Sequence, residues 1–135
     1  MKTPLEIVQL MLANDAFSNW MNLEVLTIEE GSCVLEMKVK PEMMNGFNIT
    51  HGGISYSLSD SALAFAANSR GSKCVSLETS ISHLRPTKVN DTLQAVAIEK
   101  YRGKTVGIYE VNIYNQDKKI ISIFKGTVHI SNEIW

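Results

Sequence analysis

Apolar and polar residues alternate most clearly between Ser32 and Lys40, with the two-residue period of a β-strand. One face would carry Cys33, Leu35, Met37 and Val39, and the other Val34, Glu36, Lys38 and Lys40. We therefore predict a strand with one buried and one solvent-facing side. The other predicted strands are 23–28, 73–82, 92–101, 105–114 and 120–130. Short turns at 29–31, 102–103 and 115–117 favour hairpins, so the predicted sheet is mainly antiparallel.

A helical period of about 100° per residue runs from Ile54 to Ser69 without a proline. The face predicted to pack in the core holds Ile54, Leu58, Ser61, Ala62 and Phe65. The opposite face holds Tyr56, Ser59, Asp60, Leu63, Ala64 and Ala67. An exposed helix face usually carries several paired charges, whereas this one has a single carboxylate. We expect a central helix at about 53–69 that its own sheet and a partner subunit bury on most sides.

The N-terminal region is predicted to be helical as well. Pro4 suits the first turn of a helix that extends to Leu12 and buries one side. That side would hold Leu5, Val8 and Leu12. Asn14-Asp15 offers a cap for a second short turn through Trp20, and we expect Phe17 and Trp20 to pack in the core. The order of elements is helix, two strands, long helix and four strands, which predicts an α+β fold in one domain, 1–135.

Composition and charge argue against several functional classes for this protein. A net charge of −1 and a pI near 6.3 argue against a general nucleic-acid or membrane-surface binder. Cys33 and Cys74 have no metal-ligand spacing, so we expect buried, reduced thiols. The N-terminus has no signal-peptide pattern, and no apolar run approaches the roughly 20 residues of a membrane span. A cytoplasmic, soluble protein is the expectation.

Candidate chemistry gathers where a loop enters the central helix. Thr50-His51-Gly52-Gly53 leads the chain to the helix start, where glycine permits unusual dihedrals and close approach of a ligand. A helix N-terminus has unpaired N–H groups and about half a positive charge, so it can polarise a carbonyl or hold an oxyanion. Asp60 follows about two turns later. Backbone donors followed by a protected carboxylate suggest acyl chemistry.

Several short motifs resemble those of a known family, the hotdog-fold acyl-CoA thioesterases of the phenylacetate-pathway (PaaI-like) group. The matching residues are Asn45-Gly46, His51-Gly52-Gly53, Ser57-Leu58-Ser59-Asp60, Ala66-Ala67-Asn68-Ser69 and Leu84-Arg85-Pro86. The likeness covers nearly the whole chain. It implies a hotdog fold, in which a mainly antiparallel sheet wraps around one long helix. One departure is His83, where the family more often has an aromatic such as Phe.

The resemblance also implies catalytic roles. Asp60 would act at a subunit interface as general base on water, or as nucleophile, against the thioester carbonyl. The Gly53 N–H at the helix start would polarise that carbonyl. Asn45 would help to hold the water or the carbonyl, although an Asn-Gly pair is also a turn former. His51 would lie near the thioester sulfur or only shape the loop.

Further candidates lie outside these motifs. Ser76 lies at the start of the strand after the helix, a place from which some related enzymes present a hydroxyl to the water, and Thr79 is almost as plausible by position. The phosphates of coenzyme A need cations or backbone donors, and the candidates at strand ends are Arg85, Lys88, Arg102 and Lys104. Candidates for the acyl pocket, each of which could instead be a core residue, are Phe47, Ile49, Tyr56 and Leu63.

The leading hypothesis is hydrolysis of an acyl-CoA to free acid and CoA, with a phenylacetyl, hydroxyphenylacetyl or short to medium acyl group. Coenzyme A is part of the substrate, and no cofactor or metal is implied. The active unit would be a homodimer, assembled as a dimer of dimers. The alternatives are a non-catalytic acyl-CoA-binding protein of the same fold, a hotdog dehydratase, and a domain that only mediates subunit contacts.

Overall fold

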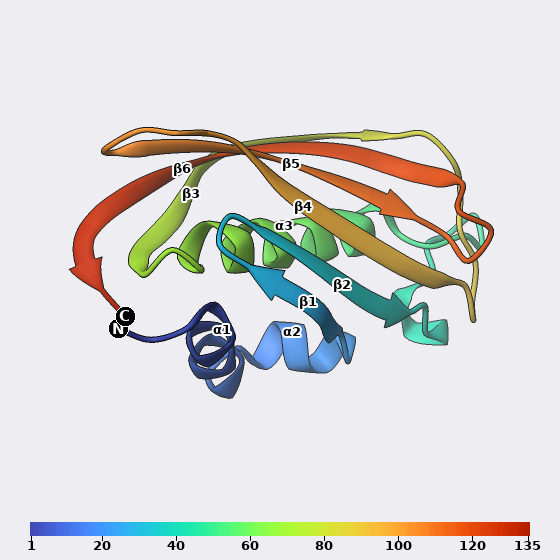
Figure 1. Ribbon diagram of the computed structural model, residues 1–135. Coiled ribbons are helices and arrows are strands. Elements are labelled where there is room, and N and C mark those ends of the chain that lie inside the picture. Colours follow the sequence, from blue (N-terminus) through green and yellow to red (C-terminus); the bar gives the residue numbers. More distant parts are fainter.

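An antiparallel six-stranded sheet curls around helix α3 (Gly52–Asn68) in the computed structural model, which describes residues 1–135 (Figure 1). The strands are β1 (Glu24–Glu29), β2 (Ser32–Lys38), β3 (Ser72–His83), β4 (Thr92–Arg102), β5 (Val106–Tyr114) and β6 (Ile120–Ile134). Their order in the sheet is β1-β2-β4-β5-β6-β3. This arrangement confirms the predicted hotdog fold and all six predicted strands. The largest difference is at β6, which continues four residues beyond the predicted end at Ile130.

The inner face of the sheet and α3 form one hydrophobic core. The inward face of β2 is buried as predicted: Cys33, Leu35, Met37 and Val39 are all nearly inaccessible. Of the predicted core face of α3, only Ser61 is partly exposed. The helix also approaches β6 closely, because a Cβ placed on Gly126 would lie 2.5 Å from Leu63 Cδ2. Glycine at this position therefore lets the sheet close onto the helix.

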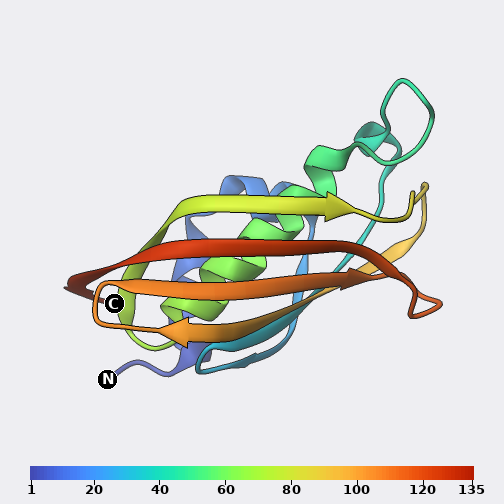
Figure 2. The same ribbon diagram turned by 90° about the horizontal axis from the view of Figure 1, so that it is seen from above.

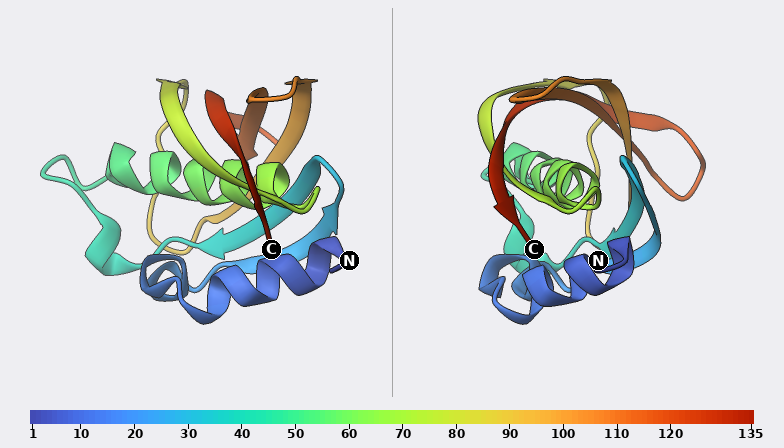
Figure 3. Two further views of the ribbon diagram at one scale, coloured as in Figure 1. Left: turned by 90° about the vertical axis from the view of Figure 1, so that its left-hand side faces the viewer. Right: turned by 60° about the vertical axis from the view of Figure 1, so that its left-hand side comes forward.

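Two N-terminal helices, α1 (Pro4–Ala13) and α2 (Ala16–Met21), cover the side of α3 that the sheet leaves open (Figure 3). A capping box between Thr3 and Glu6 starts α1, and the Asp15 side chain caps α2. The predicted buried side of α1 is confirmed at Val8, which is fully buried, and at Leu12, which packs partly buried against the core. It was wrong at Leu5, which is half exposed, and it missed the buried Ile7, because the sequence does not reveal which neighbours cover so short a helix.

The expectation for Phe17 and Trp20 was also wrong. They are 52% and 44% exposed, respectively. The residues of α2 that face inward are Ser18 and Met21, so the aromatic side chains lie on its outer surface. There the two rings contact each other at a centroid distance of 5.8 Å, and the Lys40 ammonium lies 4.5 Å from the Trp20 ring centroid.

The edge strand β3 pairs only with β6 and leaves its other edge open (Figure 2). Val75 and Leu77 on this strand are 64% and 62% exposed. An open edge with exposed apolar side chains is a surface suited to pairing with another strand. No helix in the structure has the length and apolar composition that crossing a membrane requires.

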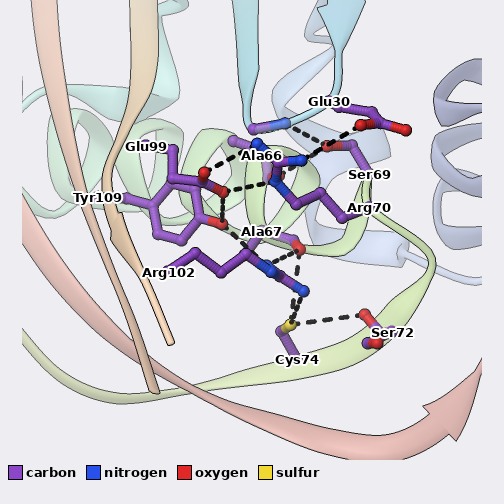
Figure 4. Close-up of polar contacts among 11 residues, drawn as sticks. Glu30, Ala66, Ala67, Ser69, Arg70, Ser72, Cys74, Glu99, Arg102 and Tyr109 are labelled. Carbon is purple, nitrogen blue, oxygen red and sulfur yellow. Dashed lines mark hydrogen bonds and ion pairs between the residues drawn. The ribbon is translucent and has the colours of Figure 1, made fainter. Parts of the chain in front are cut away.

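A polar network closes the C-terminal end of α3 (Figure 4). Arg70, just beyond the helix, donates to both carboxylate oxygens of Glu99 at 2.8 and 2.9 Å. The buried Tyr109 hydroxyl donates to Glu99 at 2.7 Å and accepts from Arg102 at 3.0 Å. Arg102 also donates to the carbonyl of Ala67 at 3.0 Å, which satisfies an oxygen in the last turn of α3. Every charged group in this cluster has an opposite or polar partner.

Candidate active site

One stripe along α3 is left partly uncovered by the sheet and by α1 and α2. Its members recur every three or four residues, as neighbours on a helix surface do. They are Gly53, Tyr56, Ser57, Asp60, Ser61 and Ala64. Asp60 is the only one with a charge, so the stripe presents a single carboxylate among mostly small side chains.

Asp60 lies between two hollows in the surface. The first, of about 320 Å³, lies between α2 and α3 and is lined by Asp15, Phe17, Ser18, Tyr56, Ser57, Asp60, Ser61 and Ala64. The second, of about 230 Å³, lies between α3 and β3 and is lined by Asp60, Leu63, Ala64, Cys74, Val75, Ser76 and Val128. The second lining is largely apolar. A group bound at Asp60 could therefore extend one arm into an apolar hollow and the other into a more polar one.

The surroundings of Asp60 favour its protonated form. Partial burial, and secondarily the negative charge of Asp15, raises the pKa of the Asp60 carboxyl. No lysine or arginine lines either hollow. A carboxylate with a raised pKa in a cleft has the properties of a general base.

Two of the predicted catalytic residues, His51 and Gly53, lie at the N-terminal end of α3. His51 is the N-cap of α3, and its Nδ1 accepts a hydrogen bond from the Gly53 N–H at 2.9 Å. The N–H predicted to polarise a carbonyl is thus already engaged by the histidine ring. A substrate oxygen would reach this donor only by replacing or sharing that bond.

Asn45 organises the preceding loop. Its side-chain oxygen accepts from the N–H groups of Phe47 at 2.9 Å and Ile49 at 3.3 Å, as in an Asx turn. This is the turn-forming role that the sequence left open as an alternative. Phe47, at the tip of this loop, is 88% exposed and lines neither hollow beside Asp60.

The structure brings Ser76 and Asp60 to the same hollow. Thr79, the other hydroxyl considered, is bonded to the Tyr56 hydroxyl. The Tyr56 ring also packs edge-on against Phe124, with centroids 5.5 Å apart. Position therefore favours Ser76 over Thr79, and of the acyl-pocket candidates Tyr56 and Leu63 line the two hollows.

The cation candidates divide between the two ends of α3. Arg85 lines a hollow of about 360 Å³ beside the helix N-terminus, together with Ile49 and His83. Lys88 lines a neighbouring hollow of about 350 Å³ that also includes Ile49. His83 Nδ1 lies 3.3 Å from the Ser55 hydroxyl oxygen, so this departure from the family pattern contacts the first turns of α3.

The prediction for Arg102 as a ligand-binding cation is not supported by its contacts. Its guanidinium is occupied by Ala67 and Tyr109, at the C-terminal end of α3. Lys104 follows in the β4–β5 turn at the same end. A 17-residue helix is about 25 Å long, so within one chain these two residues do not form a patch with Arg85 and Lys88.

Asp15 and Phe17 are among the lining residues that were not identified from the sequence. Asp15 was predicted only as a helix cap, and Phe17 as a core residue, but both line the hollow that contains Asp60. No sequence spacing links them to α3, because they reach it through the packing of α2. No group of three or more His, Cys, Asp or Glu side chains is close enough to hold a metal ion.

Known proteins match both the sequence and the fold. The model of the thioesterase superfamily matches residues 47–122. The chain is 38% identical over 119 residues to acyl-coenzyme A thioesterase PaaI of Escherichia coli, which covers 88% of this chain and 85% of that protein. It is 28% identical to human acyl-coenzyme A thioesterase 13, over 82% of this chain and 81% of that protein.

Solved structures agree with these matches. The E. coli PaaI protein from the phenylacetic acid degradation operon superimposes with a TM-score of 0.94 at 34% identity, over 97% of this chain and 95% of that one. A hypothetical thioesterase from Streptococcus pneumoniae, solved with coenzyme A, gives a TM-score of 0.88 at 25% identity, over 94% of this chain and 99% of that one. The family model covers α3 and β3 and so includes Gly53, Asp60 and Ser76. The chain belongs to the thioesterase superfamily, as a PaaI-like thioester hydrolase with the hotdog fold.

Proposed function

We propose that this protein is an acyl-CoA thioesterase that hydrolyses an acyl-CoA to the free acid and CoA, with Asp60 as the catalytic carboxylate. The observation that carries the proposal is the setting of Asp60, which lines two hollows without a cationic partner and has a raised pKa. The substrate class, acyl-CoA, is proposed from the similarity to the acyl-coenzyme A thioesterases of E. coli and human.

Asp60 performs one of two steps in this proposal. As general base it takes a proton from water while the water oxygen bonds to the thioester carbonyl carbon; the C–S bond then breaks and the proton passes to the thiolate. As nucleophile the Asp60 carboxylate bonds to the carbonyl carbon, the C–S bond breaks, and CoA leaves as a thiolate that takes a proton from water. Water then hydrolyses the mixed anhydride, which releases the free acid and restores the Asp60 carboxylate. Ser76 lines the same hollow and would hydrogen-bond to the attacking water.

The Gly53 N–H is the proposed donor to the carbonyl oxygen as negative charge develops there. His51 holds this N–H in the free protein, at 2.9 Å. In the proposed complex the histidine ring gives up the bond to the substrate oxygen and remains next to the thioester. Asn45, which fixes the loop ahead of His51, has a supporting role.

A homodimer is part of the proposal. In the single chain the hollow beside Asp60 is bounded by the edge strand β3, whose outer edge is unpaired and carries exposed Val75 and Leu77. Pairing of two such edges would bury these side chains and enclose the hollow. The Asp60 stripe of small residues would lie close to the partner, and two dimers would form the proposed tetramer.

Arg85 and Lys88 are the proposed contacts for CoA phosphates, since each lines a hollow beside the N-terminus of α3. For the acyl group we propose phenylacetyl, hydroxyphenylacetyl or a short to medium chain, and a role in phenylacetate degradation. The support is the similarity to the E. coli PaaI protein, which comes from the phenylacetic acid degradation operon, and the small, largely apolar hollow beside Asp60.

The test is release of free thiol from phenylacetyl-, hydroxyphenylacetyl-, benzoyl- and straight-chain acyl-CoAs by wild type, Asp60→Ala and Asp60→Asn. We expect turnover by wild type and its loss in both folded variants. Binding of acyl-CoA without cleavage by wild type would instead favour the non-catalytic binding protein. Measurement of mass in solution by light scattering tests the dimer and tetramer separately.

A further inference from the structure

The hollow between α2 and α3 contains two carboxylates, Asp15 and Asp60. They come from separate elements, since Asp15 is the N-cap of α2 and Asp60 lies in the middle of α3. A helix cap needs only an oxygen acceptor, which Ser, Thr or Asn would supply as well. The cap itself therefore does not require the charge of Asp15, although a negative charge is favourable at a helix N-terminus.

Asp15 is held firmly in relation to α3. One of its carboxylate oxygens accepts from the Ser18 N–H at 2.9 Å, and the other accepts from the Ser18 hydroxyl at 2.6 Å. The buried Ser18 hydroxyl is in turn 2.9 Å from the hydroxyl of Ser61, the residue next to Asp60. These bonds fix the Asp15 charge on one wall of the hollow that Asp60 lines.

Other ionisable groups do not offset this charge. On α3 the titratable side chain nearest along the stripe is Tyr56, which is bonded to Thr79. On β3 it is Cys74, a thiol whose pKa burial raises. From α2 the facing group is Asp15 itself, which raises the pKa of Asp60 in addition to burial.

We propose that Asp15 is a positioning residue for catalysis, whose fixed negative charge across the α2–α3 hollow strengthens Asp60 as the base that takes the proton from water. The inference rests on the proposed function and on Asp60 acting as a base. A nearby negative charge makes the transfer of a proton to Asp60 more favourable, because the proton reduces the repulsion between the two carboxylates. Asp15 does not contact the reacting atoms in this scheme.

The test is Asp15→Asn, which keeps an oxygen acceptor for the Ser18 N–H and removes the charge. We expect the acidic limb of the kcat/KM profile to move to lower pH, and kcat at neutral pH to fall while KM for the acyl-CoA is unchanged. Asp15→Ser, another capping residue without charge, should behave in the same way. Glu24→Gln, on β1 at the opposite edge of the sheet from β3, removes one exposed negative charge that does not line the hollow and should leave the profile where it is.

A second readout needs no substrate. NMR titration of the Asp60 side-chain carboxyl carbon should give a lower pKa in Asp15→Asn than in wild type. An unchanged titration and an unchanged acidic limb in a folded Asp15→Asn protein would overturn the inference. Lack of hydrolysis by wild type would reject the proposed function, whereas a shifted Asp60 titration in the same protein would still establish the coupling of the two carboxylates.

Discussion

Two carboxylates beside α3 have opposite surroundings. Glu99, at the C-terminal end of the helix, accepts from Arg70 and Tyr109, and the bond from Arg70 above all lowers the pKa of Glu99. Asp60, in the middle of the helix, has no cationic partner, and burial raises its pKa. A paired carboxylate favours the folded state, whereas a half-buried carboxylate without a partner opposes it. The comparison separates a group that stabilises the fold from one that opposes it, and the proposed catalytic role accounts for the second.

The largest expected effect is on the rate of hydrolysis. Asp60→Asn should lower kcat for acyl-CoA hydrolysis by about 10²- to 10⁴-fold, the usual contribution of a general base. Glu99→Gln, which makes the same chemical change at the paired site, should retain most of the activity. Steady-state thiol release by both proteins, with circular dichroism to verify folding, measures the difference. Equal losses of activity in the two variants would contradict the assignment of different roles.

The second prediction concerns stability at the paired end of α3. Tyr109→Phe removes the hydroxyl that joins Glu99 to Arg102, so two charged groups lose a buried partner. We expect a loss of about 1–3 kcal/mol in the free energy of unfolding. Urea unfolding measures it, and Tyr101→Phe, at an exposed tyrosine, is the matched control. A loss confined to activity would show that this network serves the site and not the fold.

A smaller effect is expected at the hollow beside Asp60. Ser76→Ala removes the hydroxyl proposed to orient water, which should reduce kcat by about tenfold, as for one hydrogen bond of roughly 1.4 kcal/mol. The free energy of unfolding should change little because Ser76 is exposed on the edge strand. Thr79→Ser, which keeps a hydroxyl for Tyr56, provides the comparison at the neighbouring site. A normal kcat in Ser76→Ala would remove this residue from the mechanism.

The smallest effects are expected in the pH dependence of stability. The pKa of Glu99 is lower in the folded protein than in the unfolded chain. Glu99 therefore stabilises the folded state at pH values above its unfolded-state pKa, and this stabilisation is lost as pH falls through its folded-state pKa. Asp60 has the opposite effect, because its pKa is higher in the folded protein than in the unfolded chain. The protein therefore loses free energy of unfolding as pH rises through the pKa of Asp60 in the folded state.

Urea unfolding from acidic to neutral pH checks both signs. Relative to wild type, Asp60→Asn should become more stable as pH rises. Glu99→Gln should become less stable over the same interval. Parallel curves for the two variants would show that the two carboxylates do not differ in this way.

The sequence predicted the parts of the fold that depend on local periodicity. In β2 the alternation alone identifies the buried face, because only two faces exist and one of them carries Glu36 and Lys38. Interpretation failed for α2, where six residues have no clear apolar side and Phe17 and Trp20 lie outward. The contact of Arg102 with Ala67 was not foreseen for a related reason, because it depends on the end of α3 meeting β4, 35 residues further along the chain.

The residues of the candidate site also divide into those that the sequence identifies and those that only the packing of the chain reveals. Asp60, Gly53 and His51 follow from a motif that is contiguous in the chain. Asp15 does not, because it reaches Asp60 through the docking of one helix on another. Hydrogen bonds from one serine to another, such as that between Ser18 and Ser61, leave no pattern in a single sequence.

The two buried cysteines offer a way to measure ligand binding in the unmodified protein. Burial raises the pKa of the Cys33 thiol to about 12, so this sulfur stays unreactive toward thiol reagents at neutral pH. Burial also raises the pKa of the Cys74 thiol, so its labelling is best followed at alkaline pH. Cys74 lines the hollow beside Asp60, however, and is 9% exposed against 2% for Cys33. An acyl group that fills this hollow should shield Cys74 from alkylation, so the rate of labelling at one native thiol would measure occupancy without a fluorophore or an engineered tag.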